Sequence, residues 1–72
     1  MINTANLLRR VAYAITDRDS LYDRDLLIHI WDSLIYEFPY LEEIDEDYLT
    51  HNFEKEHITI INELMNKNEY EC

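Results

Sequence analysis

Glycine is missing from the 72-residue sequence, proline occurs once, at Pro39, and the single cysteine is Cys72. A chain this poor in turn residues lacks the means to build an all-β fold or a phosphate-cradling glycine loop. One cysteine can form no internal disulfide and supplies no thiol cluster for a structural metal. No apolar run approaches the roughly 20 residues of a membrane span, and polar residues near Met1 argue against a signal peptide. These absences favour a few helices in a reducing, cytoplasmic environment.

Positive charge is also scarce. Six Lys and Arg residues stand against sixteen Asp and Glu residues, which gives a formal net charge of −10. Residues 1–16 contain two arginines and no acid, so all the acids lie in residues 17–72. Phosphate groups would repel most of this surface, which argues against direct binding to nucleic acid or to an anionic membrane. A protein partner with a basic surface would be attracted, although the same charge also serves solubility.

The strongest apolar pattern lies in residues 26–38, around the only tryptophan. Wound as a helix, its apolar residues occupy an arc of roughly 200°, whereas a surface helix needs about half of that. An arc this wide predicts cover from two directions, by two other helices or by one helix and a partner chain. Because 47% of the chain is hydrophobic, a disordered chain is excluded. We therefore predict an all-α fold, one small domain over residues 1–72, in which three or four helices surround a central helix. Its apolar residues are Leu26, Leu27, Ile28, Ile30, Trp31, Leu34, Ile35 and Phe38.

Two further helices are predicted around this central one. The first begins after Asn3 or Thr4, either of which can cap it, and runs to about Thr16. A narrow apolar stripe faces the core, while three residues point away: Arg9, Arg10 and Tyr13.

The last predicted helix begins at Asp45 and runs to about Lys67. Its weak point is residues 50–52, where poor helix formers and a cap at Asn52 would allow a break into two helices. Residues 68–72 are polar and are expected to fray.

The start of the central helix is less certain than its end. If Ser20 and Asp23 form a capping box, the helix begins at Leu21, and otherwise it begins at Leu26. It must end by the residue before Pro39, because proline excludes the preceding residue from the helical region.

The most acidic part of the chain is residues 37–48, called the acidic segment below. It places six carboxylates within eleven residues, with no Lys or Arg among them and with tyrosines between them. Exposed tyrosines beside carboxylates offer a protein partner both contact area and charge. The predicted partner-binding residues are Glu37, Tyr40, Glu42, Glu43, Asp45, Glu46, Asp47 and Tyr48. A second acidic patch lies in the connector, residues 17–25, at Asp17, Asp19, Asp23 and Asp25.

Carboxylates three or four residues apart on a helix are separated by about 6 Å, a spacing similar to that of phosphates along a DNA strand. An acidic helical surface can therefore mimic the charge pattern of DNA. In its small size, helical character and acidity the chain resembles small inhibitors encoded by phages and mobile elements, which occupy the DNA site of a host protein. The resemblance is one of type, without shared motif residues. It implies a non-enzymatic protein–protein inhibitor.

The alternative function is self-association. In this interpretation the chain is a homodimer or a regulatory subunit, and the acids only keep it soluble. The functional residues would then be apolar ones on the central helix, which bury against a second copy: Ile28, Trp31 and Ile35.

The sequence gives little support for a catalytic or metal-binding site. Glu54 and His57 have the E-x-x-H spacing of di-iron bundles, but a full site needs a second copy of the motif. Asp45, Asp47 and Glu56 match part of a calcium loop that also requires a glycine. Cys72 has no neighbour that would activate its thiol. We predict no catalytic, cofactor or metal site.

Overall fold

The computed structural model of the protein describes residues 1–66. Within this range it contains four helices, α1 (Thr4–Thr16), α2 (Arg24–Glu37), α3 (Glu46–Asn52) and α4 (Lys55–Asn66). Two strands of two residues each, β1 (Ile2–Asn3) and β2 (Glu43–Ile44), complete it. The all-α prediction is confirmed, in its four-helix form. The frayed tail predicted for residues 68–72 lies outside the described residues.

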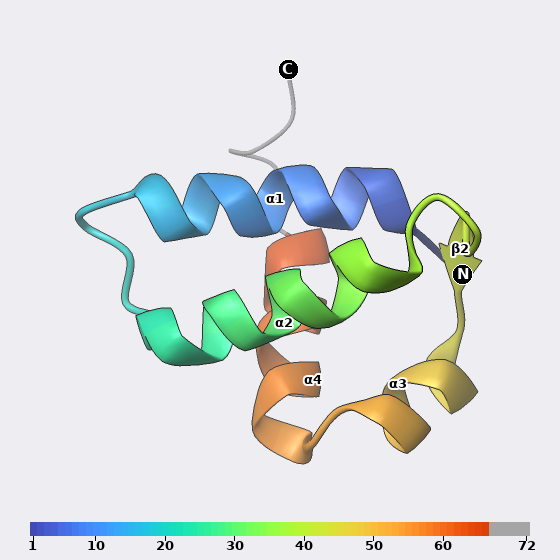
Figure 1. The fold of residues 1–72 in the computed structure, drawn as a ribbon. Coiled ribbons are helices and arrows are strands. Elements are labelled where there is room, and N and C mark those ends of the chain that lie inside the picture. The colour runs from blue at the N-terminus through green and yellow to red at the C-terminus, as the bar shows by residue number, and fades with distance from the viewer. Residues whose placement is uncertain (67–72) are drawn as a thin grey trace.

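The helices form a compact arrangement around one core (Figure 1). α1 and α2 lie side by side, joined by the connector at one end, and α4 crosses them with α3 beneath. At the other end the two strands pair antiparallel, with Ile2 opposite Ile44 and Asn3 opposite Glu43. The Thr4 N–H then donates to the Glu42 carbonyl over 2.8 Å. The sequence did not predict this small sheet, which ties the acidic segment to the start of α1.

The first two helices begin at side-chain caps. The Asn3 side chain accepts from the Asn6 N–H over 2.9 Å, so α1 starts and ends where the sequence predicts. α2 begins at Arg24, between the two predicted starts, because Asp23 is its cap and accepts from the Asp25 N–H. The Ser20 hydroxyl accepts from the Tyr22 N–H instead.

The last predicted helix is divided in two. Phe53 has extended backbone angles, and its N–H donates to the Leu49 carbonyl at the end of α3. Asn52 does not cap α4, since its amide donates back to the Tyr48 carbonyl. The break alternative is therefore confirmed, but one residue later than expected. The turn at Phe53 lets α4 change direction and cross the α1–α2 pair (Figure 1).

The core draws on all four helices and on β2. From α2, three residues are fully buried, and Leu26, Trp31 and Phe38 pack against the core while remaining half-buried. The hydrophobic core residues are Leu7, Leu8, Val11, Ala14, Leu27, Ile30, Leu34, Ile44, Leu49, Phe53, Ile60, Ile61 and Leu64.

The predicted apolar arc of α2 is only partly covered. Ile28 and Ile35 keep 40% and 42% of their surface exposed, so cover by two other helices of the chain is wrong along this edge, and cover by a partner chain stays a prediction. The buried arc is narrower than the apolar arc because the neighbouring helices cover Leu27, Ile30 and Leu34 and leave one edge to solvent.

A second correction concerns Arg10, which the sequence places on the outward face of α1. Its side chain is 2% exposed, and Nη1 donates to the Leu64 carbonyl near the end of α4 over 2.8 Å. A buried guanidinium requires such acceptors, since a buried charge without partners is costly. The bond joins the first and last helices, 54 residues apart.

Candidate protein-binding surface

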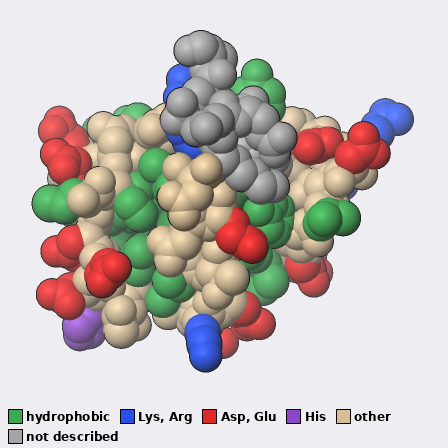
Figure 2. Space-filling view, turned by 180° about the vertical axis from the view of Figure 1, so that it is seen from behind, with side chains coloured by type: hydrophobic (Ala, Val, Ile, Leu, Met, Phe, Trp, Pro, Cys, Tyr) green, Lys and Arg blue, Asp and Glu red, His purple; other side chains and the backbone are tan. Residues whose placement is uncertain are grey.

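The acidic segment runs around the end of the molecule opposite the connector (Figure 1). All six of its carboxylate residues are exposed. Seen from behind, acidic side chains gather along the edge that carries the sheet and α3, with hydrophobic side chains between them (Figure 2). In chain order, Glu37 ends α2, Tyr40 and Glu42 lie in the following turn, Glu43 is in β2, and Asp45, Glu46, Asp47 and Tyr48 begin α3.

Local structure accounts for part of this arrangement. The Asp45 carboxylate caps α3 by accepting from the Tyr48 N–H over 2.9 Å. Glu46 and Asp47 follow in the first turn, where the helix dipole favours negative charge. Glu43 is held at the surface by its strand pairing with Asn3. These elements fix the backbone of the segment from Glu43 to Tyr48.

The two predicted partner-binding tyrosines differ. Tyr40 is 91% exposed. Tyr48 is half-buried against the core and meets the ring of Phe53 edge to face at 6.3 Å. Burial raises the pKa of the Tyr48 hydroxyl, and the negative charge of Glu37 raises that pKa further. Tyr48 is therefore partly a packing residue.

α3 divides the acidic segment between two hollows. On one side, Asp45, Glu46 and Asp47 line a groove of about 500 Å³ with residues of the sheet and α4. On the other side, Glu37 and Tyr48 line a hollow of about 410 Å³ between α2 and α3. The structure thus brings the predicted residues to one end of the molecule, but it does not gather them on one flat face.

Three of the described basic residues donate hydrogen bonds outside the acidic segment. Arg9 donates to the Asn6 side-chain oxygen over 2.6 Å, and Arg24 donates to the Ile15 carbonyl over 2.8 Å. The bond from Arg10 likewise ends on a carbonyl. These three bonds thus end on neutral groups that lie outside the acidic segment.

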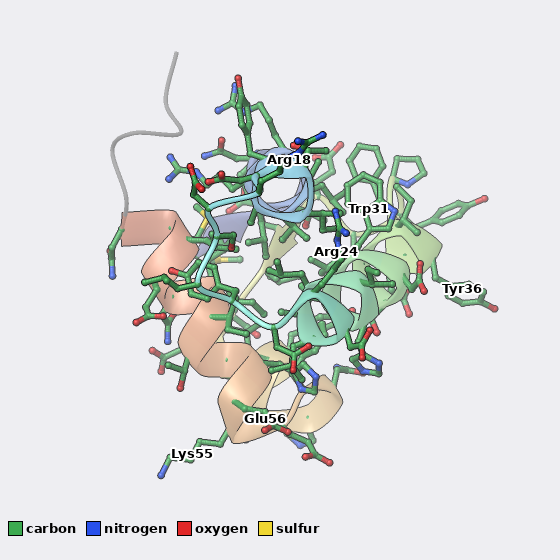
Figure 3. The ribbon with its side chains drawn as sticks, turned by 90° about the vertical axis from the view of Figure 1, so that its left-hand side faces the viewer. Arg18, Arg24, Trp31, Tyr36, Lys55 and Glu56 are labelled. Atoms are coloured by element: carbon green, nitrogen blue, oxygen red, sulfur yellow. The ribbon has the colours of Figure 1, made fainter. Side chains whose placement is uncertain are left out.

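The second acidic patch has a different character. In the connector, Asp17 accepts from the Asp19 N–H and Asp23 accepts from the Asp25 N–H, so two of its four carboxylates hold local turns. Arginines alternate with these acids. Figure 3 looks onto this end of the molecule, with Arg18 and Arg24 beside the connector and Tyr36 pointing outward from α2.

The predicted self-association residues share one edge of α2. Ile28 and Ile35 are exposed there, while Trp31 is half-buried and packs against the core.

A pair of histidines was missed by sequence reasoning. The ring of His29 on α2 stacks on that of His57 on α4, with centroids 4.7 Å apart. His57 is buried, and its Nδ1 accepts from the Glu54 N–H over 3.3 Å. The sequence places both histidines beside the apolar stripes of their helices, which is a signal for partial burial. Their stacking could not be predicted, because it depends on how the two helices cross. Glu54 and His57 are thus joined by a hydrogen bond from the Glu54 backbone N–H to the His57 ring. Residues 1–66 contain no group of three or more His, Cys, Asp or Glu side chains placed to hold a metal ion.

Among residues 1–66, none of the helices has the length and apolar character needed to cross a membrane. Comparisons with models of known protein families, with curated proteins and with solved structures gave no match.

Proposed function

We propose that this protein is a small acidic inhibitor or regulator, of the kind encoded by phages, that binds a basic nucleic-acid-binding protein. In this proposal the acidic segment enters the nucleic-acid site of the partner and takes the place of the DNA phosphates. The observation that supports the proposal most is the exposure of six carboxylates at one end of the molecule.

The physical basis is long-range attraction followed by local fit. A strongly acidic surface steers a basic partner toward it and speeds association. The small sheet and the cap at Asp45 hold the carboxylates from Glu43 to Asp47 on ordered backbone. Less conformational freedom is then lost on binding than with a disordered acidic chain.

The test is capture from a bacterial lysate on the immobilised chain, at low and at high salt. We expect the captured proteins to be nucleic-acid-binding proteins. High salt should release them, and a double-stranded DNA oligonucleotide should displace them. If the DNA oligonucleotide does not displace the captured protein, the chain does not occupy the nucleic-acid site of that protein.

A matched pair of variants tests the acidic segment itself. Replacing Glu42, Glu43, Glu46 and Asp47 by lysine should abolish capture while helicity, followed by circular dichroism, is kept. The control replaces four exposed carboxylates elsewhere, Asp19, Asp25, Glu54 and Glu63, and changes the net charge equally. If both variants lose the partner to the same extent, only total charge matters and the assignment to the acidic segment fails.

The exposed edge of α2 favours a second candidate function, self-association. Ile28 and Ile35 present apolar surface at spacing i, i+7, which a helix of a second copy could cover. This candidate predicts a dimer mass by light scattering that salt does not alter. Replacing both isoleucines by serine should return the monomer mass. A wild-type chain that is monomeric throughout removes this candidate and leaves the first.

A further inference from the structure

The groove beside the acidic segment has two chemically different parts. Its apolar surface is presented by Met1, which is exposed, and by Ile2, which is half-buried, while Ile44 and Leu49 lie beneath them, almost fully buried. Its rim is acidic, formed by Asp45, Glu46 and Asp47, all exposed. The groove therefore places apolar surface next to negative charge.

The groove continues along the line between α3 and α4. A neighbouring hollow of about 250 Å³ shares Glu46, Leu49 and Asn62 with it and extends to Ile58. The volume of the main groove, about 500 Å³, falls within the usual range for ligand sites of roughly 300–1,000 Å³. The two hollows are thus adjacent, with three lining residues in common.

We infer that this groove binds a short segment of the basic partner in which an aliphatic residue stands next to an arginine or lysine. The aliphatic side chain would pack on Met1 and Ile2, above Ile44 and Leu49, and the cationic group would reach the carboxylates of Asp45 and Glu46. This inference rests on the proposed function and names the feature of the partner that is recognised.

Charge complementarity selects this occupant. An anionic ligand would be repelled by the rim, and a purely apolar one would leave three carboxylates beside it without a counter-charge. A second copy of the chain is a poor fit, because its exposed arginines in the connector alternate with aspartates. Arg and Lys suit both parts of the groove, since their stems are apolar and their ends charged.

The groove also provides a selectivity between partners that charge alone does not provide. Carboxylates on a surface attract any basic protein, with little discrimination between partners. An apolar surface within the same site favours partners that present an aliphatic side chain at the correct place.

The test uses two defined peptides and the full chain. We would titrate the chain with acetyl-Leu-Arg-Leu-Arg-amide and with acetyl-Gly-Arg-Gly-Arg-amide, and follow the methyl groups of Ile and Leu by NMR. The leucine peptide should shift the methyl signals of Ile2, and of Ile44 and Leu49 beneath it, in a saturable way. The glycine peptide should bind about tenfold more weakly, because it buries no aliphatic side chain. Equal binding of the two peptides, or shifts confined to other methyl groups, would overturn the inference.

A variant that fills the groove without changing charge gives a second test. Asn62→Trp places a large side chain in the groove, and Asn66→Trp is the matched control one helical turn later. The first should weaken binding of the leucine peptide about tenfold, and the second should leave it unchanged. Unchanged binding in the first variant would count against the groove. If this variant loses helicity, the peptide comparison on the wild-type chain still decides.

Failure of the inference can be told apart from failure of the proposed function. If the lysine variant keeps its captured partner, the proposed function fails whatever the peptides do. If that variant loses its partner while both peptides bind equally, the carboxylates act without the groove, and only the inference falls.

Discussion

The connector and the acidic segment lie at opposite ends of the α1–α2 pair, and each carries several carboxylates (Figure 1). In the connector the acids alternate with Arg18 and Arg24, Asp17 holds a local turn and Asp23 caps α2. In the acidic segment no basic residue intervenes, and Asp45 is the carboxylate with a capping bond.

The comparison shows that counting acids does not locate a binding surface. A local turn and a helix cap account for two of the four connector carboxylates. Of the six carboxylates of the acidic segment, Glu37, Asp45, Glu46 and Asp47 line the two hollows described above. The connector also has a hollow, of about 310 Å³, with Asp17 and apolar residues in its lining, but Arg18 and Arg24 line it as well. Among the described residues, no Lys or Arg lines either hollow at the acidic segment, and this separates the two regions.

The largest difference should appear when an apolar residue at each end is truncated. Ile44→Ala at the acidic segment should cost about 2–5 kcal/mol of unfolding free energy, because Ile44 is fully buried and a cavity would remain. Leu21→Ala in the connector should change it by less than about 0.5 kcal/mol, since Leu21 is 99% exposed. Urea denaturation followed by circular dichroism measures both. Equal effects would show that the sheet end is not part of the core.

Removing a helix cap should have a smaller effect, similar at the two ends. Asp45→Ala and Asp23→Ala each delete an acceptor of a backbone N–H and should cost about 1 kcal/mol. Hydrogen exchange should quicken in the first turn of α3 for the former and of α2 for the latter. A loss of protection across the whole molecule would contradict a purely local role for these caps.

Asparagine at the same two positions separates charge from capping. Asn keeps the capping oxygen, so only the electrostatic difference between the ends remains. Both changes lose a similar favourable interaction with the helix dipole, but Asp45→Asn should be the more stable of the two relative to wild type by a few tenths of a kcal/mol at low salt, because it also relieves repulsion within the acidic segment. Asp23→Asn should be neutral or slightly destabilising, because Arg24 is adjacent. Both differences should shrink as salt is added, and a salt-independent difference would refute the electrostatic explanation.

The smallest effect concerns the titration of Tyr48. In Glu37→Gln its pKa should fall toward the ordinary tyrosine value but remain above it, because burial is the larger cause of the shift. The raised pKa means that the folded state favours the neutral phenol, so its stabilising contribution is present below pH 10 and is lost as pH rises through the folded-state pKa. NMR of the tyrosine Cζ resonance measures the pKa. An unchanged value in the variant would show that Glu37 does not act on Tyr48.

Features set by neighbouring residues could be predicted from the sequence. The caps at Asn3 and Asp45 and the end of α2 before Pro39 depend on residues within one turn of each other. The exposure of the acidic segment likewise follows from its composition. The exact break at Phe53 was less predictable, because Asn52 bonds backward to Tyr48 rather than forward.

Features set by distant contacts could not be predicted. The pairing of Ile2 with Ile44 and the stacking of His29 on His57 join segments that are far apart in the chain. The groove depends on that sheet and on the crossing of α4, so its apolar surface was invisible in the sequence. Ile28 and Ile35 were predicted as candidates for self-association, but their periodicity shows no more than an apolar face, so the sequence could not decide between cover by this chain and exposure.

The bond from Arg10 to the Leu64 carbonyl couples the two ends of the chain. When α4 is displaced, the Arg10 guanidinium loses this carbonyl as an acceptor. Burial of Arg10 on α1 is therefore linked to the docking of α4. We expect the first and last helices to lose their structure together, in one cooperative transition, and not one after the other.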